Sequence, residues 1–127
     1  MRLLLDTHIA LWALADSPRL SSRARAILEN PGNECWFSSA SAWELAIKVQ
    51  LGKYRLRYPL ADLEGAVAEA GFRNLPGSVR HAFAIESVDM PHADPFDRLL
   101  LAQCQIETLQ LLTTDKLLAD LPVAVRA

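Results

Sequence analysis

The sequence has few cysteines, no long apolar run and no excess of basic charge, and each shortage excludes a class of protein. Two cysteines in 127 residues are too few for a disulfide-stabilised secreted scaffold. Cys35 and Cys104 lie in the apolar stretches CWF and LLLAQCQI, so we expect buried free thiols in a reducing compartment. The formal net charge is -2. Any contact with nucleic acid must therefore come from local patches or a bound cation rather than from overall charge.

The N-terminal segment imitates a short signal peptide, because Met1 and Arg2 precede the apolar run LLLDTHIALWALA. Asp6 and His8 interrupt this run, and a buried strand leading into a helix explains it better. No stretch of the chain reaches the roughly 18 uninterrupted apolar residues that a membrane span needs. We expect a soluble, cytoplasmic protein with no membrane association.

The order of apolar segments predicts one α/β domain over residues 1–127, with a central, mainly parallel sheet and helices on both faces. Continuous apolar runs, typical of strands buried on both faces, predict strands at 3–5, 35–37, 109–112 and 123–125. Helical patterns lie between them, at about 9–16, 20–29, 42–51, 60–70, 79–87 and 95–106. In the third helix we expect Trp43, Ile47 and Leu51 to form the apolar face and Gly52 to be the C-cap.

Four acidic residues fall where a parallel sheet of this kind binds ligands, beyond the carboxyl ends of its strands. Asp6 directly follows the first strand, and Asp115 follows the strand that ends near Thr113. Glu44 and Asp97 lie in the first turns of two predicted helices. These four acids are candidates for one shared site.

Helix capping is the alternative interpretation of each acid taken singly. Ser41 and Glu44 have the spacing of a capping box, with Ser41 at the N-cap. Asp94 and Asp97 fit the same pattern, with Pro95 at the first helical position. The other two acids could also be N-caps.

The four acids taken together favour a cation site. Carboxylates that converge in a partly desolvated cleft repel one another, and they persist there by taking up protons or binding a cation. Oxygen ligands suit Mg²⁺ or Mn²⁺, and no grouping of histidine and cysteine indicates zinc. Such an ion can hold a phosphodiester and activate water, so the predicted chemistry is phosphodiester hydrolysis.

Four segments resemble the PIN-domain toxins called VapC, and the resemblance covers essentially the whole chain. They are LLLDTHIALWAL at 3–14, SSASAWELAIKVQLGKYRL at 38–56, HADPFDRLLLAQC at 92–104 and LLTTDKLL at 111–118. By this resemblance Asp6, Glu44 and Asp97 match the acids of the metal site. Asp115 matches a fourth acid, which the family keeps least strictly.

The resemblance also implies roles and partners. It implies an Mg²⁺- or Mn²⁺-dependent endoribonuclease that is the toxin of a toxin–antitoxin pair, forms a homodimer and is blocked by a VapB-like antitoxin. We expect Asp6 and Asp97 to contact the metal directly or through water. Glu44 and Asp115 would orient waters or hold a second ion, and the hydroxyl group of Thr7 would support the site. We assign Asp94 to helix capping.

Several other residues have two open interpretations. Arg98 would pair with a carboxylate or contact phosphate. The basic stretch with interleaved tyrosines would guide RNA or be a solvated surface; its basic members are Lys48, Lys53, Arg55 and Arg57. His8 and His92 lie beside the acids, where a hydrogen-bonded structural histidine is favoured over a general base or metal ligand. The three tryptophans, Trp12, Trp36 and Trp43, are expected to pack in apolar faces, and the helix around Trp12 could also contribute to a partner surface.

A second class of function is a non-catalytic, Mg²⁺-binding receiver domain of the response-regulator type. Receivers require an acidic pair after the first strand, an aspartate after a middle strand and a lysine after the last. This chain has a single Asp6 after its first strand, serines after its second and Arg126 after its last. The sequence therefore favours the nuclease.

Overall fold

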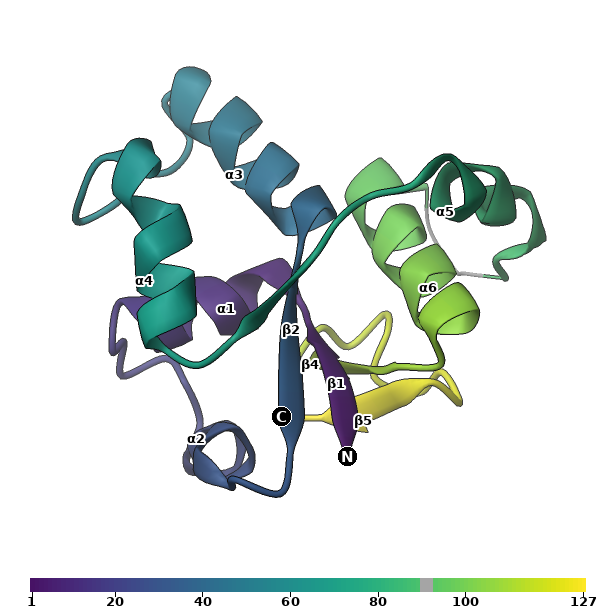
Figure 1. Cartoon of the computed structure of the whole chain (residues 1–127), viewed down its shortest axis with the longest axis horizontal. Helices are drawn as coiled ribbons and strands as arrows, with labels where there is room; N and C mark the ends of the chain where they lie inside the picture. Colours follow the sequence, from purple (N-terminus) through teal and green to yellow (C-terminus); the bar gives the residue numbers. More distant parts are fainter. Residues whose placement is uncertain (90–92) are drawn as a thin grey trace.

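The structure is a computed structural model that describes residues 1–89 and 93–127. It contains one five-stranded sheet (Figure 1). The strands are β1 (Arg2–Leu5), β2 (Glu34–Ser38), β3 (Arg73–Leu75), β4 (Gln110–Thr113) and β5 (Ala124–Arg126). Their order is β3-β2-β1-β4-β5, and every neighbouring pair is parallel. The predicted fold class is confirmed.

Helices cover both faces of this sheet. They are α1 (Thr7–Leu14), α2 (Ser22–Glu29), α3 (Ser39–Gln50), α4 (Leu63–Glu69), α5 (Val79–Ala84) and α6 (Pro95–Glu107), with short 3₁₀ turns η1 (Leu60–Asp62) and η2 (Ile85–Ser87). Ile9 of α1 and Leu63 of α4 pack with Leu3 and Leu5 of β1 on one face. Leu100 of α6 packs with Leu4 and Leu111 on the other. Successive strand residues point to opposite faces, so both faces of a continuous apolar strand are buried.

The sequence analysis missed β3. This strand has three residues, of which Leu75 alone is buried, so it carries no continuous apolar run. It lies at the edge of the sheet and pairs with β2 through Trp36 and Arg73 at its first position. The guanidinium group of Arg73 lies 5.6 Å from the centre of the Trp36 ring, which stabilises this edge by a cation–π contact.

The predicted start of α3 was wrong. The helix begins at Ser39, directly after β2, and its N-cap is Ser38, whose Oγ accepts a hydrogen bond from the backbone amide of Ala40 at 2.9 Å. Ser41 is therefore inside the helix, and no capping box with Glu44 exists.

The predicted inward face of α3 was also wrong. Trp43 is 53% exposed and Leu51 is 63% exposed, whereas Leu45 is fully buried in the core. Trp43 instead packs edge-on against Phe96 of α6, with ring centres 5.0 Å apart. Gly52 follows the helix with a φ of 73°, a left-handed conformation that glycine adopts without strain, so the predicted end of α3 is confirmed.

Other predictions can be compared with the described residues. Cys35 and Cys104 are buried free thiols, as expected. None of the described helices combines the length and the apolar character that crossing a bilayer requires. The remaining predicted strands and helices are present, with bounds that differ by a few residues.

Candidate active site

The strand order predicts that ligands bind at the carboxyl ends of β1 and β4. Sheets of this class bind ligands where the chain reverses its direction of strand addition, since the connecting helices there leave on opposite faces. From β1 the chain adds β2 and then β3 on one side, and then crosses back to place β4 on the other side of β1. Asp6 follows β1 and Asp115 follows β4 at this edge.

Asp6 is not held as a helix cap. It occupies the N-cap position of α1, but its side chain makes no capping hydrogen bond with any described residue. Its Oδ2 instead accepts a hydrogen bond from Oγ1 of Thr113 at 2.6 Å, and its backbone amide donates to the carbonyl oxygen of Leu112 at 3.0 Å. The side chain is buried. Burial raises the pKa of Asp6, and the Thr113 hydrogen bond and the nearby His8 partly offset this.

The sequence analysis did not single out Thr113. Its hydroxyl group is fully buried, donates to Asp6 and accepts a hydrogen bond from the backbone amide of Asp115 at 3.0 Å. It thereby joins the ends of β1 and β4. The available signal was its place as the last residue of a strand paired with β1, two residues before an aspartate.

Glu44 reaches the same region from α3. Thr7 of α1 and Ser41 of α3 are both buried, and their hydroxyl oxygens lie 2.8 Å apart, so the first turns of the two helices are joined. Glu44 lies one turn further along α3 and is buried. One of its oxygens, Oε2, accepts a hydrogen bond from Nζ of Lys48 at 2.6 Å.

Asp94 and Asp97 open α6. Oδ1 of Asp94 accepts hydrogen bonds from the amides of Phe96 and Asp97 at 2.9 and 3.0 Å, so its predicted capping role is confirmed. Burial raises the pKa of Asp97 to about 7, assisted by the negative charges of four neighbours: Asp94, Asp6, Asp115 and Glu44. The charges of all three other predicted site acids therefore act on the pKa of Asp97.

Asp115 begins a turn after β4. Its Oδ1 accepts a hydrogen bond from the amide of Leu117 at 2.9 Å, which is a capping contact of the kind anticipated for it. Its charge also contributes to raising the pKa of both Asp6 and Asp97. Capping and electrostatic coupling therefore coexist in this residue.

The donor set fits a hard divalent cation. The coupled groups are carboxylates, the ligands that Mg²⁺ and Mn²⁺ prefer, and their mutual repulsion leaves negative charge that a cation would neutralise. Within residues 1–89 and 93–127, no three histidine, cysteine, aspartate or glutamate side chains form a ready-made metal cluster.

The predicted basic residues differ in their partners and in their exposure to solvent. Lys48 pairs with Glu44, and Nη1 of Arg57 donates to the carbonyl oxygen of Ala15 at 3.2 Å. Lys53 and Arg55 are exposed, and Arg98 is half-buried in the first turn of α6.

The histidines fit structural roles where they are described. Nε2 of His8 lies 3.2 Å from the hydroxyl oxygen of Tyr54. His81 is buried, and its Nδ1 accepts a hydrogen bond from the amide of Ser78 at 3.1 Å. His92 lies outside the described residues.

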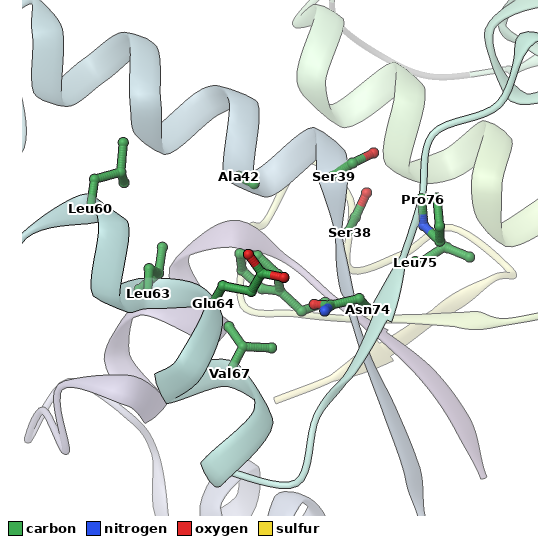
Figure 2. A pocket seen from close by; sticks show the side chains of 11 residues that line it. Ser38, Ser39, Ala42, Leu60, Leu63, Glu64, Val67, Asn74, Leu75 and Pro76 are labelled. Carbon is green, nitrogen blue, oxygen red and sulfur yellow. The ribbon is translucent and has the colours of Figure 1, made fainter.

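A separate cavity of about 360 Å³ lies between α3, α4 and the ends of β2 and β3 (Figure 2). Its lining is mainly apolar, with Glu64 and Asn74 as polar members. Ser38 and Ser39 also line it, whereas none of the four site acids does.

We expect Thr113→Val to destabilise the protein by about 1–2 kcal/mol, because the isosteric change leaves a buried carboxylate and a backbone amide without their partner. Urea unfolding of the metal-free protein measures the change. Thr114→Val is the matched control, since Thr114 is the exposed neighbour. Equal stability of the two variants would show that the Thr113 hydroxyl does not hold Asp6.

Comparison with known proteins identifies relatives of the whole chain. The profile of the PIN domain family matches residues 3–124. No curated protein sequence matches the chain. A chain of the Rickettsia felis VapBC2 complex, bound to a promoter DNA fragment, is similar in structure with a TM-score of 0.63 and 15% identity, covering 100% of this chain and 98% of that one.

Two further complexes contain similar chains. One belongs to a toxin–antitoxin complex from Klebsiella pneumoniae, with a TM-score of 0.65, 21% identity and coverage of 97% of this chain and 95% of that one. The other belongs to FitAcB from Neisseria gonorrhoeae, with a TM-score of 0.56, 22% identity and coverage of 91% and 88%. At these identities the likeness establishes the fold.

The strand order also bears on the receiver alternative. In flavodoxin-like receivers β1 lies between β2 and β3. Here β1 lies between β2 and β4. The topology therefore agrees with the sequence in disfavouring a receiver domain.

Proposed function

This chain belongs to the PIN domain family, and from that premise we propose that it is a metal-dependent endoribonuclease and the toxin of a toxin–antitoxin pair. The observation that carries the proposal is that Asp6, Glu44 and Asp115 lie close enough to Asp97 for their charges to add to the effects of burial and of Asp94, which together raise the pKa of Asp97 to about 7. A helix cap needs no such coupling, whereas a cation site is built from it.

Asp6 and Asp97 are proposed to hold Mg²⁺ or Mn²⁺, with Glu44 and Asp115 orienting water molecules or holding a second ion. When bound, the ion would activate water and neutralise charge on the leaving oxygen. Thr113 fixes the Asp6 carboxylate, and the Thr7–Ser41 contact fixes α3 relative to α1. The hydroxyl group of Thr7 is proposed to support the site through Ser41.

The RNA is proposed to approach over exposed basic residues. Lys53 and Arg55 lie in the segment after α3, and Arg57 follows them. Arg98, in the first turn of α6 beside Asp97, would contact phosphate or a carboxylate. Lys48 remains a candidate for RNA contact, although its ammonium group is already paired with Glu44. The buried free thiols are compatible with a cytoplasmic location.

Two protein partners are proposed, a VapB-like antitoxin and a second copy of this chain. One similar chain belongs to a toxin–antitoxin complex from Klebsiella pneumoniae and another to VapBC2 from Rickettsia felis, which supports the first. The exposed side chains of Trp43 and Leu51 support the second, because they leave apolar surface at the α3 helix and its C-cap in solvent. The mass of the purified protein in solution tests the dimer.

The direct test is incubation of the purified chain with structured RNA. We expect cleavage in millimolar Mg²⁺ or Mn²⁺, none with excess chelator, and recovery when the metal is restored. Cleavage that persists in chelator, or RNA that stays intact in both metals under conditions where the protein is folded, would contradict the proposed function.

A further inference from the structure

We call the carboxyl edge of the sheet with the four site acids, Asp6, Glu44, Asp97 and Asp115, the acidic edge. The pair formed by Glu44 and Lys48 links this edge to a series of polar and aromatic side chains. Nζ of Lys48 lies 2.6 Å from Oε2 of Glu44, and the two residues are one helical turn apart on α3. The Glu44 side chain is 7% exposed and that of Lys48 is 26% exposed. A buried carboxylate without a counter-charge is strongly unfavourable, so this contact has more consequence than an exposed helical pair.

Residues outside α3 hold the Lys48 side chain in place. After Gly52 the chain turns back, and the amides of Lys53 and Tyr54 donate to the carbonyl oxygen of Lys48 at 2.8 and 3.3 Å. This turn places the Tyr54 ring 5.2 Å from Nζ of Lys48, with the Tyr54 hydroxyl oxygen at 3.5 Å. The same hydroxyl lies 3.2 Å from Nε2 of His8, whose ring is 5.6 Å from that of Trp12. The ammonium group is thus fixed from two elements.

Glu44 interacts both with this fixed ammonium group and with another acid of the site. Its negative charge reaches Asp97, where it contributes to the raised pKa. Its Oε2 is nevertheless occupied by Lys48. Lys48 therefore partly neutralises one of the four acids.

We infer that Lys48 is a positioning residue, which holds the Glu44 carboxylate on the α3 side of the acidic edge and so limits the negative charge that the edge offers to a divalent cation. The inference rests on the proposed function, because it concerns the same cation. It predicts that Lys48 weakens metal binding while keeping Glu44 in the orientation that turnover requires.

Removing the ammonium group therefore has a distinctive expected result. In Lys48→Met the released Glu44 carboxylate joins the other acids, and we expect Mn²⁺ to bind about tenfold more tightly, the size expected of one unit charge acting over several ångströms of partly hydrated surface. RNA cleavage at saturating Mn²⁺ should fall in the same variant. Calorimetric titration of Mn²⁺ measures the affinity without reference to activity.

Two variants separate positioning from folding and from overall charge. Lys48→Arg keeps the cation and should restore wild-type Mn²⁺ affinity to within about twofold. Arg19→Met removes one positive charge from an exposed position beyond the far end of α1 and should leave the affinity unchanged. Circular dichroism shows whether each variant is folded. A Lys48→Met chain that does not fold would be replaced by Lys48→Gln, for which the expectation is the same.

A double-mutant cycle tests the contact in the metal-free protein. The stability lost in Lys48→Met should be largely recovered when Glu44→Gln is added, because the buried charge is removed. Equal Mn²⁺ affinity in the wild type and Lys48→Met, or weaker binding in the variant, would overturn the inference alone. A wild-type protein that does not bind Mn²⁺ would overturn the proposed function and this inference together, even if the cycle shows coupling.

Discussion

Asp97→Asn is expected to reduce metal-dependent RNA cleavage by roughly 1,000-fold or more. The amide keeps the size of the side chain but removes the charge at the position that senses all the other site acids. Loss of charge stabilisation worth about 4 kcal/mol corresponds to this factor. Asp6→Asn should have a comparable effect, because Asp6 ends β1 at the centre of the same edge. Initial rates with a fluorescent RNA measure both.

The control for this prediction is Asp62→Asn. Asp62 is exposed in η1, and its replacement makes the same chemical change away from the acidic edge. We expect wild-type cleavage from it. If Asp6→Asn and Asp97→Asn both cleave RNA at the wild-type rate, the acidic edge is not the catalytic site.

The same Asp97→Asn substitution is expected to stabilise the metal-free protein at pH 8. The pKa of Asp97 is raised from 3.8 to about 7, so at pH 8 the folded protein carries a charge that its surroundings disfavour. The full difference would correspond to about 4 kcal/mol, and solvent screening of this half-buried group reduces the expectation to about 1–2 kcal/mol. The melting temperature should rise by about 3–8 °C.

The sign of the pH dependence follows from proton binding. Between pH 3.8 and about 7 the folded state binds the Asp97 proton more tightly than the unfolded state, so stability falls as the pH rises through this window. The advantage of Asp97→Asn should therefore be small near pH 4 and greatest above pH 7. Calorimetry of both proteins across this range, in chelator, measures it.

Millimolar Mn²⁺ should reduce or reverse the difference in melting temperature between Asp97→Asn and the wild type. Binding to the folded wild type adds stability that the variant lacks, so the gap in melting temperature should narrow or change sign at pH 8. A variant that is less stable than the wild type at pH 8 without metal would show that Asp97 carries no unfavourable charge in the folded state.

Much of the fold was predictable because a strand that is buried on both faces of a sheet appears in the sequence as a continuous apolar run. The runs at 3–5 and 35–37 are continuous and apolar, and both are strands. Residues 73–75 form a strand at the sheet edge. Only one of its three residues is buried, so no apolar run in the sequence indicates it. The apolar periodicity of α3 indicated a helix correctly but did not reveal that Trp43 faces solvent.

The candidate site divides in the same way. The identity of Asp6, Glu44, Asp97 and Asp115 came from their places after strands and at helix starts, together with the family resemblance. Whether each acid caps a helix depends on hydrogen bonds across the fold. Asp94 caps α6, whereas Asp6 receives the Thr113 hydroxyl from a residue 107 positions away.

By itself, the sequence determined the parallel α/β class, the buried strands and the acids that follow them. Apolar runs and residue types are local properties of the chain, so they can be recognised without the fold. Tertiary structure alone decided that β1 lies between β2 and β4 and that Thr113 holds Asp6. These depend on strand order and on side chains meeting across the chain, and neither is encoded at a fixed spacing in sequence.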